Sequence, residues 1–105
     1  MTIENLRELL LSIAEEDAII STLFSLFIKN KGYSTQILED IIFYGVKIGW
    51  FEIVNIENDN IFYTEIEWRI DNDFQEVVFC DNDFAVKTLF TQEGGIPELF
   101  RKFIL

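Results

Sequence analysis

The chain has 105 residues, half of them hydrophobic, and a formal net charge of −11 that comes from nineteen acidic and eight basic side chains. This length suits one domain over residues 1–105, and its eleven Phe, three Tyr and two Trp supply enough apolar surface for a core, which argues against intrinsic disorder. The acidic balance opposes direct binding to nucleic acid or to an anionic membrane, because like charges repel. A basic protein is the complementary partner.

The chain contains one cysteine, Cys80, which excludes an intrachain disulfide and favours a reducing compartment. The first residues lack the basic and then apolar order of a secretory signal. The most apolar stretch, residues 18–28, is too short to cross a bilayer. We therefore expect a cytoplasmic protein. Because Cys80 ends an apolar stretch, we expect a small buried side chain rather than a reactive thiol.

Apolar residues with helical spacing predict two helices near the start of the chain. These residues are Leu6, Leu10 and Ile13 in the first helix, and Ile20, Phe24 and Phe27 in the second. Thr2 is a suitable N-cap, the acidic residues 15–17 separate the two helices, and Gly32 ends the second. A third helix is expected to begin after Ser34 or Thr35 and to end at Gly49.

After Gly49 the period of the apolar pattern changes to two, which is typical of strands. We expect strands over residues 50–57, 61–70 and 74–80, joined by turns at 58–60 and 71–73. A helix from Asp81 or Asn82 to Phe90 and a short one from Pro97 to Phe103 follow. The predicted fold is α+β: N-terminal helices, a central three-stranded antiparallel sheet and two short C-terminal helices.

The second predicted strand alternates most clearly. Its inward residues are expected to be Phe62, Ile66, Trp68 and Ile70, and its outward residues Glu65, Glu67 and Arg69. The string Asp-Asn-Asp-Phe occurs at 71–74 and again at 81–84. In each copy we interpret the polar residues as a turn or a helix cap and the Phe as an anchor in the core.

The absence of histidine removes the commonest general base at neutral pH, the Ser-His and Cys-His arrangements and most zinc sites. Glu65 and Glu67 are candidates for acid–base chemistry, but on an outward strand face they have little reason for shifted pKa values. The aspartate pairs Asp71–Asp73 and Asp81–Asp83 resemble the start of a calcium loop, but both lack the glycine and the final glutamate of such a loop. We expect no catalysis, no metal and no cofactor.

Negative charge is concentrated between residues 57 and 83, where nine acidic residues face one basic residue, Arg69, so that this segment carries eight of the eleven net charges. Acidic groups around aromatic anchors suit a basic protein surface, with Tyr63 and Trp50 as the candidate aromatic residues. The predicted partner-binding residues are Glu57, Asp59, Tyr63, Glu65, Glu67, Asp71, Asp73, Glu76, Asp81 and Asp83.

Residues 34–69, a helix followed by Gly49 and a hairpin, resemble the recognition helix and wing of a winged-helix domain. Here the helix offers Glu39 and Asp40 where DNA-binding members present basic residues, so DNA binding through that face is not implied. In size, charge and missing chemistry the chain is also similar to small acidic inhibitors of the toxin-immunity and anti-CRISPR type. That resemblance implies a non-catalytic protein that occupies the basic site of a nuclease.

The sequence therefore predicts inhibition of a basic partner, a nuclease toxin or a nucleic-acid-handling complex, through an acidic surface. The alternative is a self-associating scaffold or regulatory module, such as a homodimer, whose charge serves only solubility. An enzyme that uses carboxylates alone is the third hypothesis.

Overall fold

The structure is a computed structural model that describes residues 1–15, 18–57, 61–62, 65–83, 87 and 96–105, with residues 61 and 62 described by their backbone alone. It confirms the α+β class. The elements in chain order are α1 (Ile3–Ala14), α2 (Ile20–Leu23), the π-helix η1 (Phe24–Asn30), α3 (Thr35–Lys47), β1 (Phe51–Asn55), β2 (Ile61–Phe62), β3 (Gln75–Phe79) and the 3₁₀-helix η3 (Glu98–Phe103).

The predicted helix caps are present. The Thr2 hydroxyl accepts a hydrogen bond from the backbone of Asn5 at 3.1 Å, and the Ser34 hydroxyl accepts one from the backbone of Ile37 at 3.3 Å, so each satisfies a donor that the first helical turn leaves open. Gly32 and Gly49, which follow η1 and α3, have φ angles of 78° and 79°. Only glycine adopts this conformation without steric cost, which explains both helix ends.

The second predicted helix differs from the expectation in its winding. It begins as α2 and continues without a break as η1, whose wider π turn brings residues five apart into register. Its C-terminal end is tied to α1 because the Tyr33 hydroxyl accepts a hydrogen bond from the Asn5 amide at 2.7 Å.

The sheet has the strand order β2-β1-β3, with both pairs antiparallel. The long pair is β1 with β3, in register from Phe51 opposite Phe79 to Asn55 opposite Gln75. The third predicted strand, at 74–80, corresponds to β3. The prediction for the second strand is wrong over residues 65–70, which belong to no strand, whereas residues 61 and 62 form β2.

Residues 65–69 keep the predicted alternation without belonging to a strand. Ile66 and Trp68 are half-buried and pack against the core, whereas Glu65, Glu67 and Arg69 are exposed. An extended segment that lies on the core along one side therefore shows the same period of two as a paired strand. Alternation records which side is buried and not whether the backbone has a strand partner.

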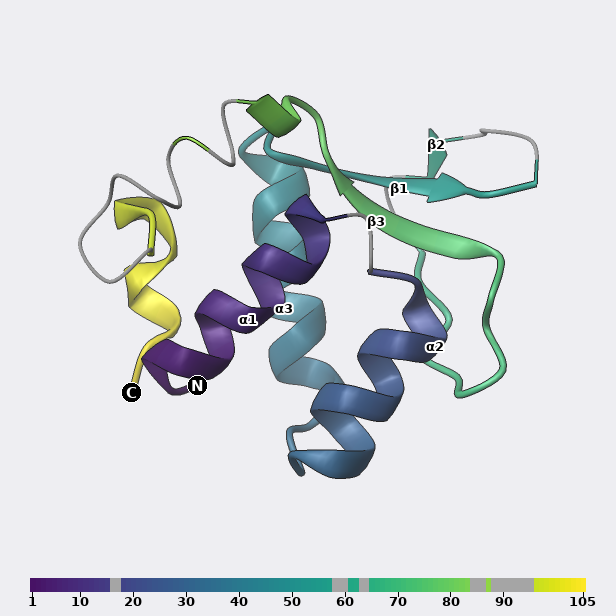
Figure 1. The fold of residues 1–105 in the computed structure, drawn as a ribbon, viewed down its shortest axis with the longest axis horizontal. Coiled ribbons are helices and arrows are strands. Elements are labelled where there is room, and N and C mark those ends of the chain that lie inside the picture. Colours follow the sequence, from purple (N-terminus) through teal and green to yellow (C-terminus); the bar gives the residue numbers. More distant parts are fainter. Residues whose placement is uncertain (16–17, 58–60, 63–64, 84–86, 88–95) are drawn as a thin grey trace.

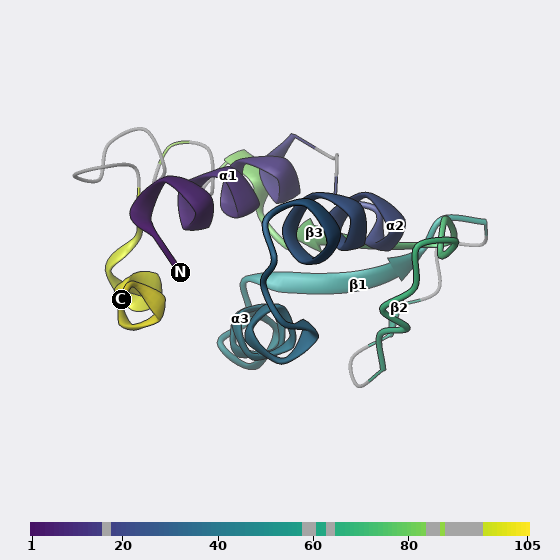
Figure 2. The ribbon, with the colours of Figure 1, turned by 90° about the horizontal axis from the view of Figure 1, so that it is seen from below.

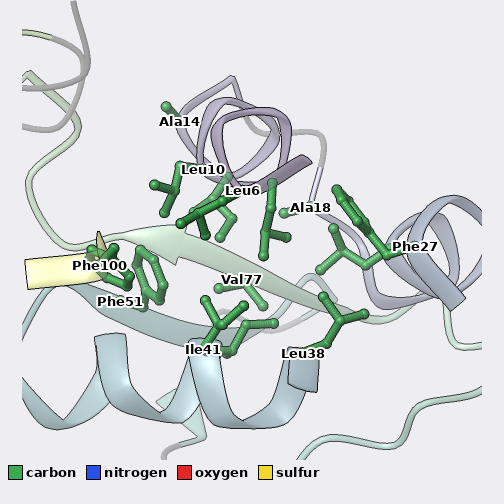
Figure 3. Packing of buried hydrophobic residues seen from close by; sticks show 14 of the residues in the cluster. Leu6, Leu10, Ala14, Ala18, Phe27, Leu38, Ile41, Phe51, Val77 and Phe100 are labelled. Atoms are coloured by element: carbon green, nitrogen blue, oxygen red, sulfur yellow. The ribbon is translucent and has the colours of Figure 1, made fainter. Parts of the chain in front are cut away.

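The helices and strands meet in one apolar cluster. Figure 1 shows β1 and β3 running across the top of the view, with α1 and α2 below them. In the view from below, α1 and α2 lie along β3 while α3 lies beside β1 (Figure 2). Leu6 and Leu10 of α1 and Ile41 of α3 converge on Val77 of β3 (Figure 3), and all four are fully buried or nearly so.

The C-terminal end closes one edge of this cluster. Phe100 of η3 is fully buried and its ring stacks on that of Phe51, with the centroids 5.5 Å apart. The short helix from Pro97 to Phe103 is confirmed as a 3₁₀-helix that begins at Glu98. The predicted helix from Asp81 or Asn82 to Phe90 lies mostly outside the described residues. Among the residues that are described, no helix is long and apolar enough to span a membrane.

Candidate protein-binding surface

Five of the predicted acidic residues lie at one end of the molecule. Glu57 follows β1, and the other four belong to the loop 65–74 that leads into β3 (Figure 1). All five side chains are exposed. We call this group the acidic end: Glu57, Glu65, Glu67, Asp71 and Asp73.

The loop of the acidic end is held in place by a buried amide. Asn72 is fully buried, and its Nδ2 donates to the Glu67 carbonyl at 2.8 Å and to Gln75 Oε1 at 2.9 Å. Its Oδ1 accepts from the backbone N–H groups of Phe74 at 3.4 Å and Gln75 at 3.3 Å. A satisfied buried network of this kind fixes one backbone conformation, so the carboxylates on either side of Asn72 are presented in a fixed arrangement.

The loop is also joined to α2. The backbone N–H of Ser21 donates to the Asn72 carbonyl at 2.8 Å, and the Ser21 hydroxyl donates to the Asp73 carboxylate. Beside this junction, Ile70, α2 and η1 line a shallow hollow of about 380 Å³. The acidic end therefore belongs to the folded body of the protein.

Arg69, the single base of the acid-rich segment, forms ion pairs inside it. Its guanidinium lies 3.5 Å from Glu67 and 3.4 Å from Asp71, and more than half of its side-chain surface is exposed. Such exposed pairs contribute little to stability, typically ~0.2–1 kcal/mol each. They hold the two carboxylates on either side of one guanidinium, and the acidic end keeps its net negative charge.

The remaining predicted residues do not join this group. Asp81 and Asp83 follow β3 at the opposite end of the sheet (Figure 1), so the predicted acidic ridge is divided into two parts. Glu76 lies between them, half-buried in β3. Asp59 and Tyr63 lie outside the described residues. Trp50 packs on Phe100 with a centroid distance of 5.3 Å and so belongs to the aromatic cluster beside the core.

Three apolar side chains at the acidic end are exposed, and two of them correct a prediction. Ile70 was expected to face inward but is 49% exposed, because it lies in the turn after the extended segment. Phe74 was expected to anchor the core but is 36% exposed. Ile56 is 42% exposed, and its backbone N–H donates to the Phe74 carbonyl at 2.9 Å, which places the two residues side by side.

The β1–β3 pair has a second face that sequence reasoning missed. Phe51, Ile53, Val77 and Phe79 are buried toward the helices, whereas the alternate residues are half-buried or exposed and point the other way. We call this the outward sheet face: Glu52, Val54, Ile56, Phe74, Glu76 and Val78. The alternation of residues 51–56 could have indicated this face. The prediction of the binding surface relied on the density of acidic residues at 57–83, and it therefore left out Glu52 and its apolar neighbours.

Cys80 continues the outward sheet face beyond Val78. It is exposed, which corrects the expectation of a buried side chain, and its backbone N–H donates to the Trp50 carbonyl at 2.8 Å. Partial desolvation raises the pKa of the thiol, and the neighbouring Glu52 carboxylate raises this pKa further through its charge and a hydrogen bond. The interaction of the thiol with Glu52 shows that the two side chains share a face.

Among the described residues, no three histidine, cysteine, aspartate or glutamate side chains gather in a way that could hold a metal ion. The chain matches no protein-family model, and comparisons with curated proteins and with solved structures found no match. The surface combines the carboxylates of Glu57 and of a fixed loop, exposed apolar side chains among them, and an adjoining sheet face of mixed apolar and acidic character.

Proposed function

We propose that this protein is a non-catalytic binding protein that inhibits a basic partner, a nuclease or another nucleic-acid-handling protein, through its acidic end. The observation that carries the proposal is the combination at one end of the molecule of five exposed carboxylates with exposed Ile56, Ile70 and Phe74. Carboxylates steer a cationic surface toward the protein, and apolar side chains among them supply contact energy once water is excluded.

The mechanism follows from the order of the loop. Because Asn72 fixes the backbone from Glu67 to Gln75, the carboxylates lose little conformational freedom on binding, and this lowers the entropic cost of association. In the complex they occupy the positions that phosphate groups of a nucleic acid take on the partner. Nucleic acid and inhibitor then compete for one basic site, and no covalent step is needed.

Charge reversal within the acidic end tests this mechanism. The double variant Glu65→Lys, Glu67→Lys should associate with the basic partner about tenfold more slowly at low salt, and its association rate should depend less on salt. The matched control is Glu4→Lys, Glu15→Lys, which changes the net charge equally at two exposed positions, one in the first turn of α1 and one at its C-cap. Stopped-flow or surface-plasmon-resonance measurements give the association rates of both variants at low and at high salt. Equal rates for the wild type and the Glu65, Glu67 variant at low salt would place the binding surface elsewhere.

The proposal also requires competition. Added protein should reduce both nucleic-acid binding and cleavage by the partner, and excess nucleic acid should release the protein from the complex. A ternary complex with full cleavage activity would exclude inhibition by site occupation.

A further inference from the structure

The outward sheet face has a composition and register that suit a second layer of structure. Glu52 lies opposite Val78, and Val54 lies opposite Glu76, so carboxylates and apolar side chains alternate across the two strands. Glu52 and Glu76 occupy diagonal positions, whose Cα atoms lie about 7–8 Å apart in antiparallel pairs. Ile56 and Phe74 extend the same face toward the acidic end.

This face is left open by the protein's own described helices. The residues of β1 and β3 that pack with α1 and α3 in the core, Phe51, Ile53 and Val77, belong to the opposite face. Figure 1 shows α1 and α2 on the lower side of the strands. A sheet face that is partly apolar is normally covered by a second layer, and apolar patches left open on a monomer mark contact sites.

The chemistry of the face selects its occupant. In a face-to-face dimer, Glu52 and Glu76 of one copy would lie against the same two glutamates of the other. Each copy also carries a net charge of −11, so electrostatic repulsion opposes this pairing. Addition of a strand at the outer edge of β3 is hindered because residues 18 and 19 already pair there. The Val77 backbone N–H donates to the Ala18 carbonyl at 3.0 Å, and Ile19 is bridged to Glu76. What remains is an element that lies across the face and carries both apolar and basic side chains.

We propose that the outward sheet face receives an amphipathic basic helix of the partner. The apolar stripe of that helix packs on Val54, Val78 and Phe74, and its lysine or arginine side chains meet Glu52 and the acidic end. This inference rests on the proposed function, which it deepens by naming the partner's binding element. In the complex the sheet becomes the middle layer between the protein's own helices and the helix of its partner.

The probe is a synthetic, capped helical peptide of about five turns with leucine along one face and lysine and arginine along its flanks. Its comparator keeps the leucines and replaces every basic residue with glutamate. Backbone amide chemical shifts of the full-length protein, followed during titration with each peptide, locate the contact. We expect the basic peptide to shift the amides of residues 52, 54, 56, 74, 76 and 78, and we expect the acidic comparator to bind at least about tenfold more weakly.

Two variants separate the face from the acidic end. Val78→Lys places a cation on the face opposite Glu52, where opposite charges in a cross-strand pair attract, and should weaken peptide binding about tenfold. Leu99→Lys is the matched control, because Leu99 is 47% exposed on η3, outside this face, and it should change affinity less than about twofold. Glu52→Gln removes one charge with little change in shape and should weaken binding and reduce its salt dependence.

Each outcome bears on a different part of the account. Shifts confined to residues 65–73, with equal affinity for the Val78→Lys and Leu99→Lys variants, would overturn the helix-binding face and leave the acidic end as the binding surface. Equal binding of the basic and acidic peptides at the face would support apolar docking there but contradict the selection of a basic occupant and, with it, the electrostatic basis of the proposed function. No binding of either peptide would overturn the inference, while the charge-reversal test on the basic partner would still decide the proposed function.

Discussion

At the scale of single residues, Asn72 combines complete burial with hydrogen bonds from both ends of its side-chain amide. Replacement by alanine removes these bonds, so that the backbone groups around Asn72 lose this buried partner and Gln75 Oε1 keeps only its hydrogen bond from the Glu67 N–H. We expect Asn72→Ala to lower the free energy of unfolding by about 2–3 kcal/mol. Urea denaturation of this variant and of Asn30→Ala checks the prediction, because Asn30 is exposed and its replacement should change stability by less than ~0.5 kcal/mol.

The Asn72 variant also links stability to binding. With the loop no longer fixed, the carboxylates of Glu67, Asp71 and Asp73 remain but must be ordered when the partner binds. Affinity for the basic partner should therefore fall although the net charge is unchanged. An Asn72→Ala protein as stable as Asn30→Ala would show that the amide network does not hold the loop.

Gly45 is a residue whose role follows from packing rather than from a turn. It lies within α3, and a Cβ at this position would overlap the ring of Phe51, which is buried in the core. Alanine usually stabilises a helix by about 1 kcal/mol relative to glycine, but overpacking of a core typically costs ~1–3 kcal/mol. We expect Gly45→Ala to be destabilising by about 1–2 kcal/mol.

The double variant Gly45→Ala, Phe51→Leu tests the cause. Because the smaller side chain at position 51 relieves the overlap, the two substitutions should be less than additive in thermal or urea unfolding. Strict additivity, or a stabilised Gly45→Ala protein, would mean that the ring moves aside without cost.

At the scale of elements, the outward sheet face makes Cys80 a reporter of Glu52. Desolvation and the Glu52 carboxylate raise the pKa of the thiol, so less of it is thiolate at pH 8 than in a free cysteine. We expect slow alkylation by iodoacetamide, and a faster reaction in Glu52→Gln with its pH midpoint shifted downward. The control Glu57→Gln removes a charge at the acidic end and should leave the rate unchanged. An unchanged alkylation rate in Glu52→Gln would show that the Glu52 carboxylate does not act on the Cys80 thiol.

Sequence reasoning located the helices well because their ends depend on local chemistry. Thr2 and Ser34 cap the first turns of α1 and α3 with their own hydroxyls, and Gly32 and Gly49 adopt the positive φ that ends a helix. Each of these features is decided within a few residues of the chain. They could be predicted without knowing what the helix packs against.

The sheet could not be predicted in the same way because strand pairing depends on distant residues. The pattern at 65–70 indicated which side chains would be buried, and Ile66 and Trp68 do pack on the core. It could not indicate that β1 would pair along its length with β3, or that residues 65–70 would form no strand. The buried Asn72, which directs the chain from the loop into β3, looked like an ordinary turn residue in the sequence.

The sequence predicted the acidic residues of the candidate site but not its exposed apolar residues. Counting acids found Glu57, Glu65, Glu67, Asp71 and Asp73, which the fold brings to one end, and also Asp81 and Asp83, which it does not. Charge is visible in a sequence, but the exposure of an apolar residue depends on which elements cover it. Ile70 and Phe74 were therefore assigned to the interior.

At the scale of the whole molecule, the excess charge and the exposed apolar residues lead to different behaviour in salt. Attraction between the acidic end and a basic partner weakens as salt rises, because the Debye length falls to about 10 Å at 0.1 M. Self-association through Ile56, Ile70 and Phe74 would change little with salt, since burial of apolar surface is scarcely screened. Salt dependence therefore separates inhibition of a basic partner from a self-associating module.

The most direct measurement is a pull-down from source cells with the tagged full-length protein, at low and at moderate salt, followed by mass spectrometry of the bound proteins. The Glu65→Lys, Glu67→Lys variant and its Glu4→Lys, Glu15→Lys control are used in parallel. We predict that the wild type and the control retain one basic, nucleic-acid-handling protein at low salt and lose much of it at moderate salt, and that the Glu65, Glu67 variant does not retain it. Recovery of the protein itself alone, to the same extent at both salt concentrations and with all variants, would contradict the account and identify a self-associating module.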